Sequence, residues 1–383
     1  MSAILNVLAI LKSYRFPPDF RGALERLFLD NVNRVQSRTR ISAKPLSIKT
    51  QEYRMRKLCR SFEELRENGY ALQSPYSLKG KHIQALVDLW VKDGQSGGTI
   101  ENKLTYFRAL AGWMGKSSAV GTLADYANRE ALGLVRSYVA LTDKSWDGNG
   151  VDAAAKIGEI AATDINVAMQ LKLQATFGLR VEESFMLRPS EAVRDADFLA
   201  VVRGTKGGRA REVPLEFKFN VLEEAARLAN PYTGSMMPHG RTKTQWKDHY
   251  YYVLKCHGVT EGGLGVTSHG LRHQYLQQLY ERLTNVSAPI KGASKRLDRE
   301  THRAAIQRVV EAAGHSRATK ANAYLSTYRT VALLRTTTVT PQQVAAMLEV
   351  AGGNKSEAAK ALGISRQALY RHLKQADLHT DGQ

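Results

Sequence analysis

Apolar residues recur with helical spacing along most of the chain. Residues 47–65, 79–91 and 99–113 each place apolar or aromatic side chains three and four positions apart. No strand-like run separates these segments. The pattern predicts a small all-helical domain over residues 46–143.

Residues 143–150 are rich in Asp and Gly, a composition that predicts a linker. The pattern of apolar residues changes after this segment. Two short apolar runs, 198–202 and 211–215, flank a turn with two glycines. Because glycine accepts the backbone angles of a tight hairpin, we expect these runs to pair. Helical patterns surround them, so residues 151–338 predict a mostly helical domain with a small sheet.

Helix start and stop signals return near the end of the chain. Pro341 is a favourable first residue of a helix, and the glycines at 352–353 break that helix. Ser356 and Ser365 can each cap a further short helix. Residues 341–383 therefore predict a helix-turn-helix, and the whole chain is predicted to be mainly α with a small β-sheet.

The net charge of the chain indicates what kind of partner it binds. The 383 residues are enough for two or three domains, and they carry a net charge of +19. A surplus of this size attracts polyanions, with nucleic acid first among them. Residues 1–60 hold 13 Lys and Arg against 4 Asp and Glu, a net +9. Residues 1–45 are therefore predicted to form a basic N-terminal arm, with a solvated basic face as the alternative.

The cysteines and the start of the chain bear on its compartment. Cys59 and Cys256 lie far apart, which argues against a disulfide framework and fits a reducing cytosol. The apolar run 2–11 has no preceding basic residue and is too short to span a bilayer, so it predicts an amphipathic helix. The ten histidines show no zinc-site pattern. We expect a cytoplasmic, nucleoid-associated protein with no metal and no membrane partner.

Separated polar residues could together attack a phosphodiester with a tyrosine hydroxyl. Such a hydroxyl has a pKa near ~10, so its proton must be removed while fixed donors meet the growing charge on phosphorus. Arg180 and Arg272 can grip the non-bridging oxygens with forked donors. Lys206, on the predicted hairpin, can protonate the departing 5′ oxygen, and His269 can assist proton transfer. Lys218 and other loop lysines remain alternatives to Lys206.

The order and spacing of these residues resemble the tyrosine recombinases, the lambda-integrase-like family. The resemblance covers about residues 150–330 and rests on four motifs taken together. They are Gly178-Leu179-Arg180 with Glu183 three residues on, His269-x-x-Arg272, Gly314-His315, and Tyr324 nine residues after His315.

This resemblance implies further roles and a domain plan. Tyr324 would form a 3′-phosphotyrosine link, His315 would hydrogen-bond the phosphate, and Glu183 would orient Arg180. The arginines would bind the scissile phosphate, without metal, ATP or another cofactor. Residues 46–143 would be a helical, SAM-like core-binding domain and residues 151–338 an α+β catalytic domain, forming a C-shaped clamp round DNA. Tyr328, four residues after Tyr324, is the competing nucleophile.

The segment after residue 341 resembles the Fis-type helix-turn-helix of bacterial transcription activators. The motif runs from Gly353 to Lys374, with apolar residues packing its first helix. The resemblance implies that four residues of the second helix face DNA. These are Ser365, Arg366, Gln367 and Arg371. The alternative is a dimerising or docking tail.

The combined interpretation is a site-specific DNA recombinase, an integrase that acts on double-stranded attachment sites as a homotetramer. The length, basic arm and extra helix-turn-helix favour integration or excision of a mobile genetic element, with DNA-bending or excision proteins as accessory partners. Two alternatives stay open at this point. One is relaxation of DNA by a type IB topoisomerase, and the other is a catalytically silent DNA-binding regulator.

Overall fold

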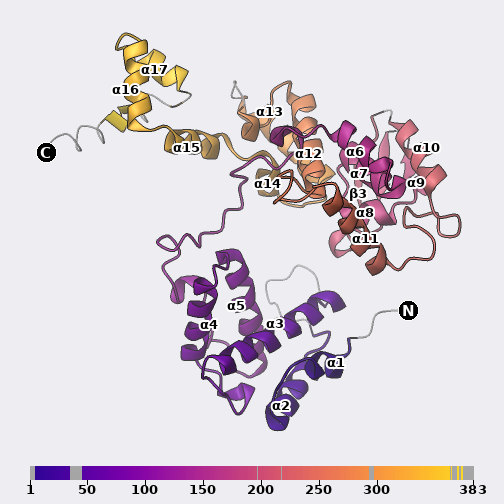
Figure 1. Cartoon of the computed structure of the whole chain (residues 1–383), viewed down its shortest axis with the longest axis vertical. Coiled ribbons are helices and arrows are strands. Elements are labelled where there is room, and N and C mark those ends of the chain that lie inside the picture. Colours follow the sequence, from indigo (N-terminus) through magenta and orange to yellow (C-terminus); the bar gives the residue numbers. More distant parts are fainter. Residues whose placement is uncertain are drawn as a thin grey trace. The chain divides into compact units, whose positions relative to one another are not determined.

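The chain divides into two compact units, Met1–Arg136 and Ser137–Gln383 (Figure 1). The computed structural model describes residues 5–34, 45–195, 197–216, 218–292, 297–362, 364, 369–370 and 372–373.

The described part of the first unit is entirely helical, as the spacing of its apolar residues predicts. Ser47 and Ser96 cap the helices that follow them, each accepting from a backbone N–H of the first turn. Phe62 is buried between Phe20 and Phe107, at ring-centroid distances of 5.1 and 5.8 Å. The elements are α1 (Val7–Lys12), α2 (Pro18–Leu29), α3 (Ile48–Glu67), η1 (Pro75–Ser77), α4 (Gly80–Lys92), α5 (Gly97–Trp113) and η2 (Leu123–Asp125).

Two helices within the predicted basic arm belong to this core. Phe20 and Phe28 of α2 are buried in the same cluster as residues of α3, α4 and α5. The sequence pattern predicted an amphipathic helix at residues 2–11, where α1 lies, but it did not predict α2. The described part of residues 1–45 therefore contributes apolar packing to the first unit as well as charge.

The second unit combines many helices with one small sheet. Its elements before the sheet are η3 (Asp147–Asn149), α6 (Ala153–Ala161), α7 (Ile165–Phe177), α8 (Val181–Met186) and α9 (Pro189–Ala192). The sheet contains β1 (Val193–Asp195), β2 (Phe198–Val201) and β3 (Arg211–Pro214), with η4 (Lys206–Gly208) between β2 and β3. Then follow α10 (Phe219–Leu228), α11 (Lys243–Cys256), α12 (Ser268–Thr284), η5 (Pro289–Lys291), α13 (Arg299–Ala312), η6 (Ala318–Ala321), α14 (Asn322–Leu325), α15 (Tyr328–Thr338), α16 (Pro341–Val350) and α17 (Lys355–Ala361).

The three strands are antiparallel in the order β1-β2-β3. The predicted hairpin is confirmed, with Leu199 opposite Val213 and Val201 opposite Arg211. β1 was not predicted, since three residues are too few to show an alternating pattern.

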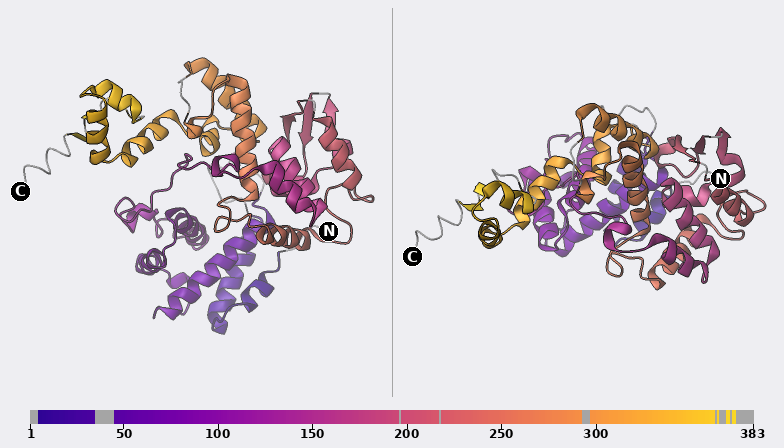
Figure 2. Two further views of the ribbon diagram at one scale, coloured as in Figure 1. Left: turned by 45° about the horizontal axis from the view of Figure 1, so that its top comes forward. Right: turned by 90° about the horizontal axis from the view of Figure 1, so that it is seen from above.

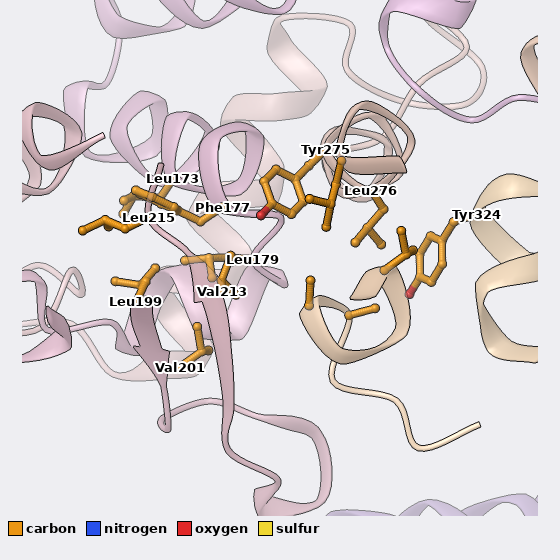
Figure 3. Close-up of a cluster of buried hydrophobic side chains, with 14 of the residues drawn as sticks. Leu173, Phe177, Leu179, Leu199, Val201, Val213, Leu215, Tyr275, Leu276 and Tyr324 are labelled. Atoms are coloured by element: carbon orange, nitrogen blue, oxygen red, sulfur yellow. The ribbon is translucent and has the colours of Figure 1, made fainter. Parts of the chain in front are cut away.

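The main core of the second unit joins this sheet to the central helices. α7 packs against α12, and both can be followed in Figures 1 and 2. Figure 3 shows one continuous cluster that reaches from the sheet to α14. Its labelled residues are Leu173, Phe177, Leu179, Leu199, Val201, Val213, Leu215, Tyr275, Leu276 and Tyr324.

A second core anchors the segment that was predicted as a linker. Trp146 is fully buried in a cluster with Phe185 and Leu271. Its indole N–H donates to the carbonyl oxygen of Thr267 at 2.8 Å, one residue before α12 begins. This contact holds residues 143–150 against the start of α12.

The C-terminal helices have a small core of their own. Val344 of α16 packs with Ala358 and Ala359 of α17. The predicted helix after Pro341 and the first helix of the motif at 353–374 are therefore present, whereas most of the second helix of that motif lies outside the described residues. Within the described ranges, no helix has both the length and the apolar character that a bilayer crossing requires.

Replacing Trp146 with alanine is expected to destabilise the second unit by roughly 3–5 kcal/mol, because a large buried side chain is lost and a cavity remains. Hydrogen exchange of amides in α12 and in α4, measured in a urea series, reports the two units separately. Protection in α12 should fall and protection in α4 should not. Tyr232→Ala is the control, since Tyr232 is 79% exposed. Equal protection of α12 in the wild type and in Trp146→Ala would contradict the anchoring role.

Candidate functional site

Arg180 lies where two helices meet. α7 ends at Gly178, whose φ of +60° is a left-handed conformation that favours glycine. A Cβ atom at this position would lie 2.3 Å from the ring of Tyr275. The chain then turns so that Arg180 is the N-cap residue of α8, and its guanidinium donates to the carbonyl oxygen of Ala313 at 2.9 Å. The predicted Gly-Leu-Arg motif is therefore a helix end that directs an arginine to the far end of α13.

The Glu183 carboxylate binds two arginines in the interior. Its Oε1 atom accepts from Arg180 Nη1 at 2.7 Å, and its Oε2 atom accepts from the Arg180 backbone N–H at 2.6 Å. Arg211 of β3 donates to both carboxylate oxygens, at 2.5 and 2.7 Å. Burial alone would raise the pKa of Glu183, but the hydrogen bonds and charges of Arg211 and Arg180 lower it to about 2. Glu183 is therefore ionised and holds both guanidiniums in place.

Arg272 of α12 is fully buried. It donates through Nη2 to the carbonyl oxygen of Ala313 at 2.5 Å and through Nη1 to the carbonyl oxygen of Gly178. Burial lowers its pKa to about 10, and the nearby charges of Arg211 and Arg180 act in the same direction. Arg272 remains charged at neutral pH, and Ala313 joins it to Arg180.

The Tyr324 hydroxyl lies beside this pair of arginines. It is 3.4 Å from Arg272 Nε and 3.2 Å from His315 Nε2. The residue is 6% exposed, and its ring centroid lies 4.8 Å from that of His273 and 6.5 Å from that of His269. Four residues that are distant in the sequence thus surround one tyrosine side chain.

The three histidines around Tyr324 all have lowered pKa values. Desolvation, followed by neighbouring positive charges, lowers the pKa of His315 to about 4 and that of His269 to about 4. Desolvation, followed by the charges of His269 and Lys144, lowers the pKa of His273 to about 3. Of the two α12 histidines, His273 is buried and His269 is exposed. At neutral pH the imidazoles are uncharged and can accept a proton or a hydrogen bond.

Lys206 lies on the hairpin turn between β2 and β3, where the sequence predicted it. It is exposed, and its charge contributes to the lowered pKa of His315. The structure thus brings Arg180, Glu183, His269, Arg272, His315 and Tyr324 together, with Lys206 on an open turn next to them.

The competing nucleophile lies elsewhere. The Tyr328 hydroxyl is 3.4 Å from the hydroxyl of Tyr280, whose oxygen is also 2.7 Å from His302 Nδ1. Between the two tyrosines, Ser326 has φ +61° and ψ −165°, a backbone conformation that L-residues rarely adopt. This break ends α14, and Tyr328 pairs with Tyr280, whereas Tyr324 contacts Arg272.

Reasoning from the sequence missed Arg211 and Gln277 and gave His273 only the role of a structural or DNA-facing neighbour. Arg211 shares the Glu183 carboxylate, and His273 lies against the Tyr324 ring. Gln277 donates to the Tyr324 carbonyl oxygen at 3.2 Å and to Asp143 at 2.9 Å. Spacing along α12 offers a signal for two of them, since His273 and Gln277 follow His269 at four-residue intervals on one helix face.

Two predictions stay predictions: the DNA-facing residues of the helix-turn-helix and the absence of a metal or cofactor. The four residues predicted to face DNA in the helix-turn-helix, Ser365, Arg366, Gln367 and Arg371, lie outside the described residues. Among the residues that are described, no three or more His, Cys, Asp or Glu side chains gather in a way that could hold a metal ion. The expected absence of a metal or cofactor stays a prediction.

The arrangement can bind one anion next to a tyrosine. Arg180 and Arg272 carry fixed positive charge, and the side chain of Arg180 keeps 20% of its surface exposed. An open groove of about 690 Å³ has Arg211, Gly314 and His315 in its wall, so the site can be reached from the surface. Forked guanidinium donors match the oxygens of a phosphate group.

Comparison with protein families identifies three segments. The family described as "Integrase" matches residues 141–278, and "Phage integrase, N-terminal" matches residues 40–120. "Bacterial regulatory protein, Fis family" matches residues 342–375. A search of the curated proteins gave no match.

The fold is similar to that of two solved structures. One is a lambda integrase fragment, a dimer bound to a COC′ core site, with 16% identity over 80% of this chain and 95% of that chain at a TM-score of 0.50. The other is a lambda integrase dimer bound to a COC′ core site, with 15% identity over 84% of this chain and 80% of that chain at a TM-score of 0.51. At these identities the comparison shows the fold, which is the one predicted from the sequence.

Replacing His273 with phenylalanine is expected to weaken the acid sensitivity of the fold. The pKa of His273 lies near 3 in the folded protein, whereas that of an unfolded histidine is near ~6.5. Between pH 3 and pH ~6.5 the unfolded state therefore binds more protons than the folded state. The stability that neutral His273 contributes above pH ~6.5 is therefore lost as the pH falls towards 3.

Chemical denaturation at pH 7 and at pH 4 measures this loss. At about 1.4 kcal/mol per pKa unit, the fall in the free energy of unfolding should be smaller in His273→Phe by on the order of 2 kcal/mol. His239→Phe is the control, because His239 is exposed. An unchanged pH dependence in His273→Phe would show that His273 is not held neutral.

Proposed function

We propose that this chain is a tyrosine site-specific recombinase of the integrase type, which cleaves and rejoins DNA through a 3′-phosphotyrosine link at Tyr324. The observation that carries the proposal is the place of the Tyr324 hydroxyl, between Arg272 Nε at 3.4 Å and His315 Nε2 at 3.2 Å. A nucleophile next to a guanidinium and a neutral imidazole has the groups needed for attack on a phosphodiester.

The two arginines would hold the scissile phosphate. Arg180 and Arg272 approach the same backbone oxygen of Ala313 from different helices, so their spacing is fixed before DNA arrives. In the transition state, charge spreads over the non-bridging oxygens, and donors that are already in position stabilise it without further rearrangement. Attack by Tyr324 on phosphorus forms the tyrosine–phosphate bond as the bond to the 5′ oxygen breaks.

Proton transfer would be divided among three side chains. A bound phosphate places His315 within reach of a non-bridging oxygen, while His269, neutral at pH 7, accepts the hydroxyl proton of Tyr324. Lys206 donates a proton to the departing 5′ oxygen from its exposed turn. Rejoining runs through the same groups in reverse, so the phosphotyrosine bond conserves the energy of the broken phosphodiester and ATP is not consumed.

The predicted domains would share the binding of double-stranded attachment sites. We assign catalysis to residues 151–338, core-site binding to residues 46–143, additional phosphate contacts to the arm at 1–45, and a separate DNA contact to residues 341–383. Exchange between two duplexes breaks four strands, and each tyrosine cleaves one strand, which requires a homotetramer. A mobile genetic element in a bacterial nucleoid is the proposed setting, with DNA-bending or excision proteins as accessory partners.

Replacing Tyr324 with phenylalanine is expected to abolish covalent attachment to DNA, since the attacking oxygen is lost. Wild type and variant are incubated with nicked duplexes that carry the ends of the element, and adducts are separated on a denaturing gel. Tyr328→Phe is the matched control and should still form the adduct. An adduct with Tyr324→Phe would assign the nucleophile to another residue, and supercoil relaxation without a specific site would favour a topoisomerase.

Replacing Lys206 with alanine is expected to slow cleavage by about 10²–10⁴-fold, because the 5′ oxygen then departs without a proton donor. A substrate with sulfur in place of that bridging oxygen tests the role directly, since a thiolate departs without protonation. This substrate should restore most of the rate to Lys206→Ala, and Lys218→Ala should behave like wild type on both substrates. Equal defects of Lys206→Ala on both substrates would exclude a general-acid role.

A further inference from the structure

A buried carboxylate next to a phosphate-binding arginine poses an electrostatic problem. The side chain of Glu183 is completely buried and ionised, and it accepts two hydrogen bonds from Arg180. If these two residues were the only charges, the carboxylate would cancel the charge of Arg180. An arriving phosphate would then meet a neutral ion pair.

Arg211 supplies the missing positive charge. Its side chain is 3% exposed, and it grips both oxygens of Glu183 side-on, at 2.5 and 2.7 Å. Three of its donors are used within the protein, since Nε donates to the carbonyl oxygen of Ala312 at 2.8 Å. Arg180 in contrast uses one side-chain donor for Glu183 and one for Ala313, which leaves donors free on an accessible guanidinium.

Arg211 also fixes the chain that leads to His315. Ala312 is the last residue of α13, and its carbonyl oxygen has no partner within the helix. A cation at this position is also favoured by the helix dipole. Gly314 follows with φ +63°, and a Cβ atom there would lie 2.9 Å from Arg211 Cδ. The Arg211 side chain thus packs directly against the turn between α13 and His315.

We propose that Arg211 is a positioning residue for DNA cleavage, which acts as the counter-ion of Glu183 so that the charge of Arg180 stays available to the scissile phosphate. In the same position it holds the end of α13 and thereby the imidazole of His315. This role rests on the proposed recombinase function. Arg211 does not touch the DNA.

The proposal has a consequence for pH dependence. Without Arg211, burial raises the pKa of Glu183, and Arg180 is left as its main partner. As the pH falls through the raised pKa, Glu183 becomes neutral and releases Arg180. The charged or titratable groups that act on Glu183 are Arg180 from its own segment, Arg211 from β3 and His269 from α12, while Arg272 and His315 act on Arg180 or its neighbours.

The test is the single-turnover rate of adduct formation on nicked DNA at saturating protein, with DNA affinity measured separately. Arg211→Met should slow adduct formation by about 10²-fold, because the groups around the phosphate are misplaced. DNA affinity should change by less than about threefold, since many phosphate contacts contribute to it. The rate ratio of Arg211→Met to wild type should rise as the pH is lowered from 8 to 6.

The double variant Arg211→Met/Glu183→Gln separates charge balance from packing. The double variant removes the unpaired carboxylate but leaves an acceptor for Arg180. Its rate of adduct formation should therefore be roughly tenfold higher than that of Arg211→Met. Arg211→Lys keeps the charge but not the forked geometry, so it should lie between wild type and Arg211→Met. The surface pair Arg188 and Glu191, joined at 2.9 Å, is the matched control, and Arg188→Met with or without Glu191→Gln should leave the rate unchanged.

Four outcomes contradict either the positioning role of Arg211 or the function on which it rests. Adduct formation by wild type together with an unchanged rate in Arg211→Met overturns the positioning role and leaves the recombinase function intact. A double variant as slow as Arg211→Met at every pH also overturns it, because packing alone then explains the loss. If Arg211→Met does not fold, a double variant that folds yet is slowed by about 10²-fold at every pH overturns it, because removing the unpaired carboxylate then restores nothing. Failure of wild type to form any adduct contradicts the recombinase function itself.

Discussion

The catalytic unit depends on bringing like charges together before any substrate is present. Arg180, Arg211 and Arg272 converge on the end of α13, where their mutual repulsion and loss of water oppose folding. The buried carboxylate of Glu183 and the terminal carbonyl oxygens of Ala312 and Ala313 compensate for this. Because these acceptors come from separate segments, the arginines are correctly placed only when α8, β3, α12 and α13 have all packed. Folding of this unit and the assembly of the three arginines, the proposed phosphate site, are therefore coupled.

Local signals were sufficient for most of the architecture. Helical spacing of apolar residues located α3, α4 and α5, and a glycine-containing turn between apolar runs located the hairpin of β2 and β3. Of the residues chosen for chemistry, His269, Arg272 and His315 lie around Tyr324, and two of the motifs carry a locally recognisable turn. Gly178 before Arg180 and Gly314 before His315 illustrate this, since both have positive φ.

Local sequence patterns did not predict the contacts between distant segments. In the sequence, Arg211 is a single charged residue on a predicted strand. Its partner Glu183 lies twenty-eight residues earlier, so no local spacing indicates the pair. Trp146 sits among Asp, Gly and Asn, a composition that predicts a linker, yet it is buried against α12. α2 was missed because its burial depends on α3, which lies beyond another segment of the chain. In each case the deciding energy is tertiary burial or ion pairing, which local propensity does not contain.

The backbone break at Ser326 has an evolutionary consequence. It ends the one-turn helix that carries Tyr324 and starts a new helix direction at Tyr328. A continuous helix would couple every later insertion or deletion to the rotation of the tyrosine. With the break in place, segments can be gained, lost or exchanged after Ser326 without changing how Tyr324 faces the arginines. Among the described residues after Ser326, α16 and α17 pack around a core of their own and illustrate such a separate segment.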